Sequence, residues 1–150
     1  MLIEPGNLTL DQIQRIHQGA GPLALSDDCR PGIRASAQVV RAAADGDAPV
    51  YGVNTGFGKL ANQPISKTDL ATLQLNLIRS HCVGVGEPLS PPVVRLMLAL
   101  KAASLARGYS GVREEVVDTI LAVANAGLVP WVPARGSVGA SGDLAPLAHM

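Results

Sequence analysis

The chain has 150 residues, 47% hydrophobic and 16% charged, which is enough for one domain with a real core. Lysine plus arginine and aspartate plus glutamate number 12 each, so the formal charge is zero and a nucleic-acid partner is not expected. The sequence contains no signal peptide pattern, no run of about 20 apolar residues that would span a membrane, and no metal-ligand spacing of cysteine and histidine. We therefore expect one domain over residues 1–150, cytoplasmic, without membrane or metal.

Helical patterns punctuated by glycine come first in the chain. Thr9 and Gln12 form a capping box that predicts a helix ending near Gly19. A second helix is predicted over about residues 28–44, because Pro31 is tolerated in a first turn.

Three more helices are predicted further along the chain. Ser66 with Asp69 resembles a cap for a helix that runs towards His81, and the next helix begins at Ser90 and ends near Gly108. Apolar residues at helical spacing predict the buried faces of this helix and of the one that follows it: Val93, Leu96, Met97 and Leu100 in the former, and Val112, Val116, Ile120 and Val123 in the latter. The sequence thus predicts a mainly α fold with little β structure.

Two glycine-rich stretches, residues 50–58 and 130–142, interrupt the helical pattern. Such glycine density indicates backbone at positive φ or in close approach to a ligand. The first stretch lacks the Gly-Lys-Ser/Thr ending of a P-loop and the context of a dinucleotide fingerprint. Either stretch alone would be read as a surface turn, but together they favour a shared site.

Ala140-Ser141-Gly142, in the second stretch, is able to react with itself. Because Gly142 has no Cβ, its nitrogen can approach the carbonyl carbon of Ala140, and attack with loss of water closes a five-membered imidazolone ring. Loss of a second water from the Ser141 side chain leaves an exocyclic methylene. The product is a strong electrophile that no ordinary side chain supplies.

Two motifs together resemble the signatures of the aromatic amino acid ammonia-lyases. One is Gly-Ser-Val-Gly-Ala-Ser-Gly-Asp-Leu-Ala-Pro-Leu-Ala-His at residues 136–149, and the other is Tyr-Gly-Val-Asn-Thr-Gly-Phe-Gly at residues 51–58. The resemblance covers nearly the whole chain. It implies the N-terminal helical domain of that fold, ending before the central helical bundle. It also implies a 4-methylidene-imidazol-5-one formed autocatalytically from Ala140, Ser141 and Gly142.

The resemblance also implies roles for other residues. Non-oxidative loss of ammonia from an aromatic amino acid needs a base for the β-proton, and Tyr51 is the candidate base or part of the proton relay. Asn54 and Gly58 are implied on the substrate side, and Asp143 in support of ring formation. Without the motifs, Tyr51 would be interpreted as a half-buried aromatic, Asn54 as a residue that shapes its loop, and Asp143 as a helix cap. His149, next to the last residue, is expected to have a disordered side chain.

Ser80-His81 occupies the place of the pair that lines the substrate-ring pocket in this family, and resembles the members that act on histidine. An imidazole is smaller and more polar than a phenyl ring, so a short side chain and hydrogen-bonding partners suit it. A histidine near a helix end is otherwise more often structural. The resemblance implies elimination of ammonia from L-histidine to trans-urocanate, a step of histidine degradation. A tyrosine or phenylalanine ammonia-lyase or aminomutase is the alternative.

Two other classes of protein stay open. In a serine hydrolase, Ser141 would be the nucleophile and His81 the base, although the motif is not G-x-S-x-G and no strand clearly precedes it. In a non-catalytic helical dimerisation or regulatory module, the lyase machinery would be lost, because the family's other catalytic residues follow Met150. For the same reason we expect little ring formation or activity in the 150 residues alone. The parent is expected to be a homotetramer with active sites built from more than one subunit.

Overall fold

The computed structural model describes all 150 residues, except for the side chain of Ser141. The described helices are α1 (Leu10–His17), α2 (Arg30–Asp45), α3 (Leu70–His81), α4 (Pro91–Leu105), α5 (Glu114–Asn125) and α6 (Leu144–His149), with 3₁₀ turns η1 (Asp27–Cys29), η2 (Gly58–Leu60) and η3 (Gly139–Ser141). The strands are β1 (Leu2–Ile3), β2 (Ala24–Leu25), β3 (Val85–Pro88) and β4 (Pro133–Arg135). The expected mainly α fold with little β structure is confirmed.

The first helix begins at its predicted cap, and the second spans Arg30–Asp45, starting two residues later than predicted because residues 28–29 belong to η1. At α1 the Gln12 backbone N–H donates to Thr9 Oγ1 at 3.3 Å, and the Thr9 N–H donates to Gln12 Oε1 at 2.9 Å, which completes the capping box. In α2, Pro31 lies in the first turn, where its missing N–H costs nothing. Gly46 ends α2 and donates its N–H to the carbonyl of Ala42 at 3.1 Å.

The capping interaction predicted for the start of α3, from Ser66 and Asp69, is wrong. The helix begins at Leu70, and Ser66 Oγ instead donates to Asp69 Oδ2 at 2.7 Å. Asp69 occupies the N-cap position, and its side chain makes no capping bond to the described backbone. The two side chains satisfy each other in the turn before the helix, so neither caps it.

The core lies between α4, α5 and α1. The face that α4 buries is Val94, Leu98, Ala99, Ala102 and Ala103, and α5 buries Val117, Leu121 and Ala124. The predicted faces are therefore rotated: Leu100 is 39% exposed, and most of the other expected residues only pack against the edge of the core. The reason is the alanines, whose small side chains let α4 approach its neighbours closely and so define its inner face.

Arg95 fastens the ends of two neighbouring helices to α4. Its guanidinium donates to the carbonyls of Ile16 (3.2 Å), Ala124 (2.9 Å) and Gly21 (2.7 Å). These carbonyls lie at or just beyond the C-terminal ends of α1 and α5, where backbone acceptors lack partners within the helix. A single planar group thus satisfies three helix-end or loop acceptors at once.

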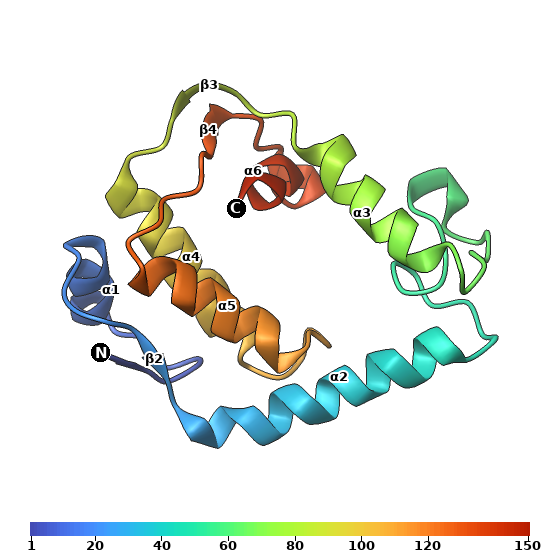
Figure 1. Cartoon of the computed structure of the whole chain (residues 1–150), viewed down its shortest axis with the longest axis horizontal. Coiled ribbons are helices and arrows are strands. Elements are labelled where there is room, and N and C mark those ends of the chain that lie inside the picture. The colour runs from blue at the N-terminus through green and yellow to red at the C-terminus, as the bar shows by residue number, and fades with distance from the viewer.

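Two small sheets join segments that are distant in sequence. β1 pairs in parallel with β2, and β3 pairs in antiparallel with β4. The second pairing brings the chain after α3 against the chain before α6, and α6 also contacts α3 (Figure 1). Figure 1 shows α2 and α3 following one another around one side, with α4 and α5 packed together on the other.

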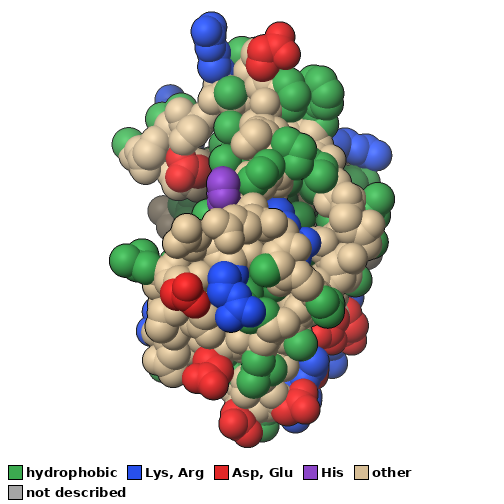
Figure 2. Space-filling model, turned by 90° about the vertical axis from the view of Figure 1, so that its left-hand side faces the viewer, with side chains coloured by type: hydrophobic (Ala, Val, Ile, Leu, Met, Phe, Trp, Pro, Cys, Tyr) green, Lys and Arg blue, Asp and Glu red, His purple; other side chains and the backbone are tan. Residues whose placement is uncertain are grey.

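The surface carries mixed charge. Figure 2 shows acidic and basic side chains distributed among hydrophobic ones on the face that lies to the left in Figure 1. None of the helices that the structure describes is long and apolar enough to cross a membrane.

Candidate functional site

Ala140-Ser141-Gly142, called the tripeptide below, lies in a tight turn between β4 and α6. The η3 turn begins at Gly139 and is followed by Gly142, whose N–H donates to the Gly139 carbonyl at 3.4 Å. Gly142 has φ 85° and ψ 33°, the left-handed region that favours glycine. A compact turn of this kind folds the Gly142 nitrogen back towards the preceding residues, whereas an extended backbone would carry it away.

Asp143 follows the tripeptide in an unusual backbone conformation. It has φ 55° and ψ 39°, and among the described residues it is the only non-glycine residue at positive φ. It stands at the N-cap position of α6, but its side chain makes no capping bond to the backbone that the structure describes. Instead, Ser137 Oγ donates a hydrogen bond to Asp143 Oδ1. The predicted position at a helix start is confirmed, and the predicted capping by the side chain is wrong because the carboxylate bonds to Ser137.

The segment after Ser80-His81 packs directly against the segment before the tripeptide. In the β3–β4 pairing, Val85 is opposite Arg135. A Cβ placed on Gly136 would lie 3.0 Å from the Cα of Gly84, so this close approach requires glycine. The backbone therefore holds the end of α3 next to the base of the tripeptide loop.

His149 fastens the same junction from α6. Its Nε2 accepts a hydrogen bond from the Gly84 N–H at 3.0 Å. The expectation of a disordered side chain is wrong, because the Gly84 N–H gives the imidazole a fixed partner. An imidazole nitrogen that accepts this bond is unprotonated, so the ring carries its proton on Nδ1.

Ser80 and His81 are the last two residues of α3, and their side chains turn back onto that helix. Ser80 Oγ donates to the Leu77 carbonyl at 2.9 Å, and His81 Nδ1 lies 2.8 Å from the same oxygen. A proton on Nδ1 donates to this carbonyl and leaves the lone pair on Nε2. Both side chains therefore satisfy a helix-end carbonyl, while Nε2 of His81 keeps its capacity to accept a hydrogen bond.

Tyr51 lies in a loop at the other end of α3. Its ring is 62% exposed and contacts the ring of Phe57 edge to face, with centroids 5.8 Å apart. Tyr51 is thus more exposed than the half-buried aromatic expected from the sequence. The loop is tied to the N-terminal half of α3 by Gln74, whose Nε2 donates to the Gly52 carbonyl at 3.4 Å.

Asn54 organises the Tyr51 loop. It is only 8% exposed, accepts the Val50 N–H at 2.7 Å and donates to the carbonyls of Ala48 (2.9 Å) and Ala43 (3.1 Å). These bonds shape the loop and attach it to the end of α2. Gly58 begins η2 with φ 57°, a conformation that glycine adopts readily.

The candidate residues thus fall into two groups. The structure brings the ends of the Ser80-His81 segment and the tripeptide loop together, whereas the Tyr51 loop stays at the far end of α3 (Figure 1). Sequence reasoning missed Ser137, Gly84 and the fixed position of His149. The sequence did contain a signal for this contact, namely the glycines on either side of Val85 together with Gly136. Glycines on two facing segments permit the two backbones to approach closely.

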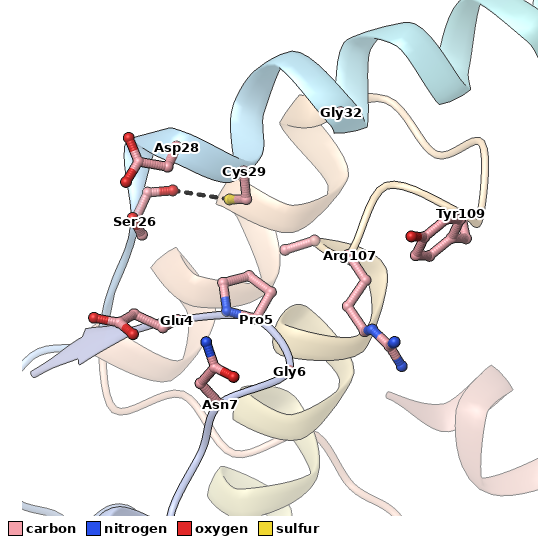
Figure 3. A pocket seen from close by; sticks show the side chains of 11 residues that line it. Glu4, Pro5, Gly6, Asn7, Ser26, Asp28, Cys29, Gly32, Arg107 and Tyr109 are labelled. Carbon is pink, nitrogen blue, oxygen red and sulfur yellow. Dashed lines mark hydrogen bonds between the residues drawn. The ribbon is translucent and has the colours of Figure 1, made fainter.

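A separate cavity of about 720 Å³ lies away from these residues, between the loop after β1, the start of α2 and the end of α4 (Figure 3). Glu4, Asp28 and Arg107 are among its lining residues. Cys29 Sγ donates to the Ser26 carbonyl at 2.8 Å, as the dashed line in Figure 3 marks. Burial raises the pKa of the Cys29 thiol, which favours a protonated donor over a nucleophilic thiolate.

Among the described side chains, no group of three or more histidine, cysteine, aspartate or glutamate residues is close enough to hold a metal ion.

The Ala-Ser-Gly turn on a mainly helical fold agrees with one class of protein, the lyases that act on aromatic amino acids. The chain belongs to the aromatic amino acid lyase family, whose model matches residues 8–150. It is 55% identical to a histidine ammonia-lyase of Rhodospirillum rubrum over 150 residues, which is 100% of this chain and 29% of that protein.

Solved structures agree with this assignment. The fold is similar to histidine ammonia-lyase from Trypanosoma cruzi, with 40% identity and a TM-score of 0.88 over 99% of this chain and 28% of that one. It is also similar to tyrosine aminomutase from Streptomyces globisporus, with 29% identity and a TM-score of 0.89 over 99% and 28% of the two chains. The 150 residues therefore span less than a third of the length of these relatives.

Proposed function

We propose that the full-length protein containing this chain eliminates ammonia from L-histidine to give trans-urocanate, in the cytoplasm and as a step of histidine degradation. The observation that supports this most is the junction of Gly84, Gly136 and His149, because it joins the Ser80-His81 segment to the tripeptide loop. Identity of 55% to a relative described as a histidine ammonia-lyase supports the same substrate.

The tripeptide suits a 4-methylidene-imidazol-5-one group. Its backbone is already folded into a compact turn, and Gly142 adopts a conformation that other residues avoid. Apart from Gly142 and its two chain neighbours, no described residue has an atom within 4 Å of a Cβ placed on Gly142. When formed, the group supplies an electrophilic carbon that binds the substrate amine and makes ammonia a better leaving group.

The remaining candidate residues bind the substrate and move its proton. Ser80 and His81 offer a hydroxyl and an imidazole Nε2 to the imidazole ring of the substrate. Tyr51 removes the β-proton or relays it, and Asn54 and Gly58 hold its loop in shape. Because this loop lies at the far end of α3 from the tripeptide, we propose that it serves the site of a neighbouring subunit in a homotetramer.

The test is an absorbance assay with the full-length protein on three amino acids. Histidine is expected to give urocanate, while phenylalanine and tyrosine give none of their corresponding acrylates. Equal release of an acrylate from phenylalanine or tyrosine would contradict the histidine assignment.

An aminomutase is the second candidate, because tyrosine aminomutase shares this fold. It is distinguished by its product, since an aminomutase returns a β-amino acid where a lyase releases ammonia. A protein that forms neither product and shows no ring by mass spectrometry would instead be a non-catalytic helical module.

A further inference from the structure

Ser137 and Asp143 flank the tripeptide on its two sides. The Ser137 hydroxyl donates to a carboxylate oxygen of Asp143, which closes a loop with the tripeptide inside it. Within this loop, the Gly142 N–H donates to the Gly139 carbonyl at 3.4 Å. Two nested hydrogen bonds therefore hold this stretch of backbone compact.

The base of the loop is fixed by packing. A Cβ placed on Gly136 would lie 3.0 Å from Gly84 Cα and 3.3 Å from the Cβ of Ala145, which is buried. The chain just before Ser137 and the chain just after Asp143 thus lie against each other. With the base fixed in this way, the Ser137–Asp143 bond spans the segment that contains the tripeptide.

Asp143 itself shows that this arrangement is imposed on the backbone. Its φ of 55° lies in the left-handed region, which non-glycine residues enter uncommonly, aspartate and asparagine more often than the others. Strained residues of this kind persist only where surrounding contacts hold them. The contact that the Asp143 side chain makes in the structure is its bond to Ser137, because the described backbone of α6 receives no cap from it.

We propose that Ser137 is a positioning residue for ring formation: through Asp143, its hydroxyl holds the tripeptide in the compact form from which the ring closes. The proposal rests on the proposed function. In ring closure, the Gly142 nitrogen bonds to the Ala140 carbonyl carbon, and that carbonyl oxygen leaves as water with the amide hydrogens of Gly142 and Ser141. A second water takes the hydroxyl and the α-hydrogen of Ser141. No oxidant or reductant is needed.

The experiment follows ring formation in the full-length protein directly, by intact mass after a pulse of synthesis. The wild type is expected to lose two waters, about 36 Da per chain, by simple stoichiometry. Ser137→Ala is expected to slow this loss about tenfold or more, as removal of a hydrogen bond to a charged group would. Ser137→Thr keeps the hydroxyl and is expected to mature nearly as the wild type. Ser104→Ala, at an exposed position of α4, is the control.

A matched pair separates the hydroxyl from folding defects. Ser137→Thr and Ser137→Val have the same shape, so both should fold alike by circular dichroism while only the valine variant matures slowly. In an Asp143→Ala background, Ser137→Ala is expected to add no further delay, because the two residues act as a unit.

Three results would overturn the proposal. The first is a Ser137→Ala variant that loses the two waters at the wild-type rate, and the second is equal rates in Ser137→Thr and Ser137→Val. The third is a further delay when Ser137→Ala is added to the Asp143→Ala variant. A wild-type protein that never loses the two waters would instead refute the proposed ring chemistry, and this proposal with it. Wild-type maturation and urocanate formation with an unaffected Ser137→Ala would refute this proposal alone.

Discussion

At the scale of single residues, glycine and histidine decide how the candidate site is built. Gly84 and Gly136 let two backbones touch, and His149 accepts the N–H that this contact leaves free. None of these positions carries chemistry in the proposed reaction. Gly84, Gly136 and His149 instead position the segments that bear the proposed reactive residues. In many proteins a rigid scaffold positions functional loops in this way.

Replacing Gly136 tests this junction. Gly136→Ala is expected to destabilise the protein by about 1–3 kcal/mol, because a Cβ would collide with Gly84 and φ is 138°. The midpoint of thermal unfolding of the full-length protein measures the loss. Gly32→Ala is the control. Gly32 lies inside α2, a Cβ placed on it would have its nearest neighbour at 4.0 Å, and alanine favours a helix. An unchanged midpoint in Gly136→Ala would contradict the close contact.

At the scale of elements, α2 and α5 are joined by ion pairs around Glu114. Its carboxylate accepts hydrogen bonds from Arg30 at 2.5 Å and from Arg34 at 3.0 Å. Arg30 also pairs with Asp118 at 3.3 Å and with Asp27 at 2.9 Å. The hydrogen bonds from Arg30 and then Arg34 hold the pKa of Glu114 below its ordinary value.

This network predicts a pH dependence with a definite sign. Because the folded-state pKa of Glu114 is lowered, its contribution is complete above the ordinary carboxylate pKa and is lost as pH falls through the folded-state value. Glu114→Gln is therefore expected to lower the unfolding midpoint at neutral pH and to flatten its decline in acid. Thermal unfolding at a series of pH values measures both effects. Glu115→Gln, an exposed neighbour, should leave the profile as it is, and a parallel profile for Glu114→Gln would contradict the assignment.

The sequence predicted the helices of this fold well and their packing less well. Thr9, Gln12 and Pro31 carry local signals, and local signals determine where α1 and α2 begin. The inner face of α4 depends instead on which neighbouring helix packs against it. The alanines of α4 are therefore buried, while the larger Leu100 is partly exposed. In the site, the chemistry of an Ala-Ser-Gly sequence identified the tripeptide, and motif resemblance added Tyr51 and Ser80-His81. The Ser137–Asp143 bond was out of reach, because it forms only once β4 and α6 are placed.

At the scale of the whole molecule, much apolar surface is open in these 150 residues. None of the described side chains of α3 is buried, and Leu75 and Ile78 are 48% and 55% exposed. Relatives more than three times as long have further chain available to cover such a surface. Support for the tripeptide loop in the full-length protein is therefore expected to come partly from that further chain.

The 150 residues expressed alone are accordingly expected to keep an unmodified tripeptide and to form no urocanate. Intact mass provides the measurement, with the full-length protein as the positive control. A deficit of about 36 Da in the short chain, from loss of two waters, would show that the loop folds and closes without further support.

The placement of the Tyr51 loop at one end of α3 and the tripeptide at the other has a genetic consequence. If the tyrosine of one copy serves the ring of another, two differently inactivated chains should rescue each other. Proteins that carry only Tyr51→Phe or only Ser141→Ala are each expected to be inactive. If subunits share sites as proposed, co-expression should restore part of the urocanate formation, because some mixed sites pair an intact tyrosine with an intact ring. Failure of mixed oligomers to recover any activity would mean that each chain supplies both groups to its own site.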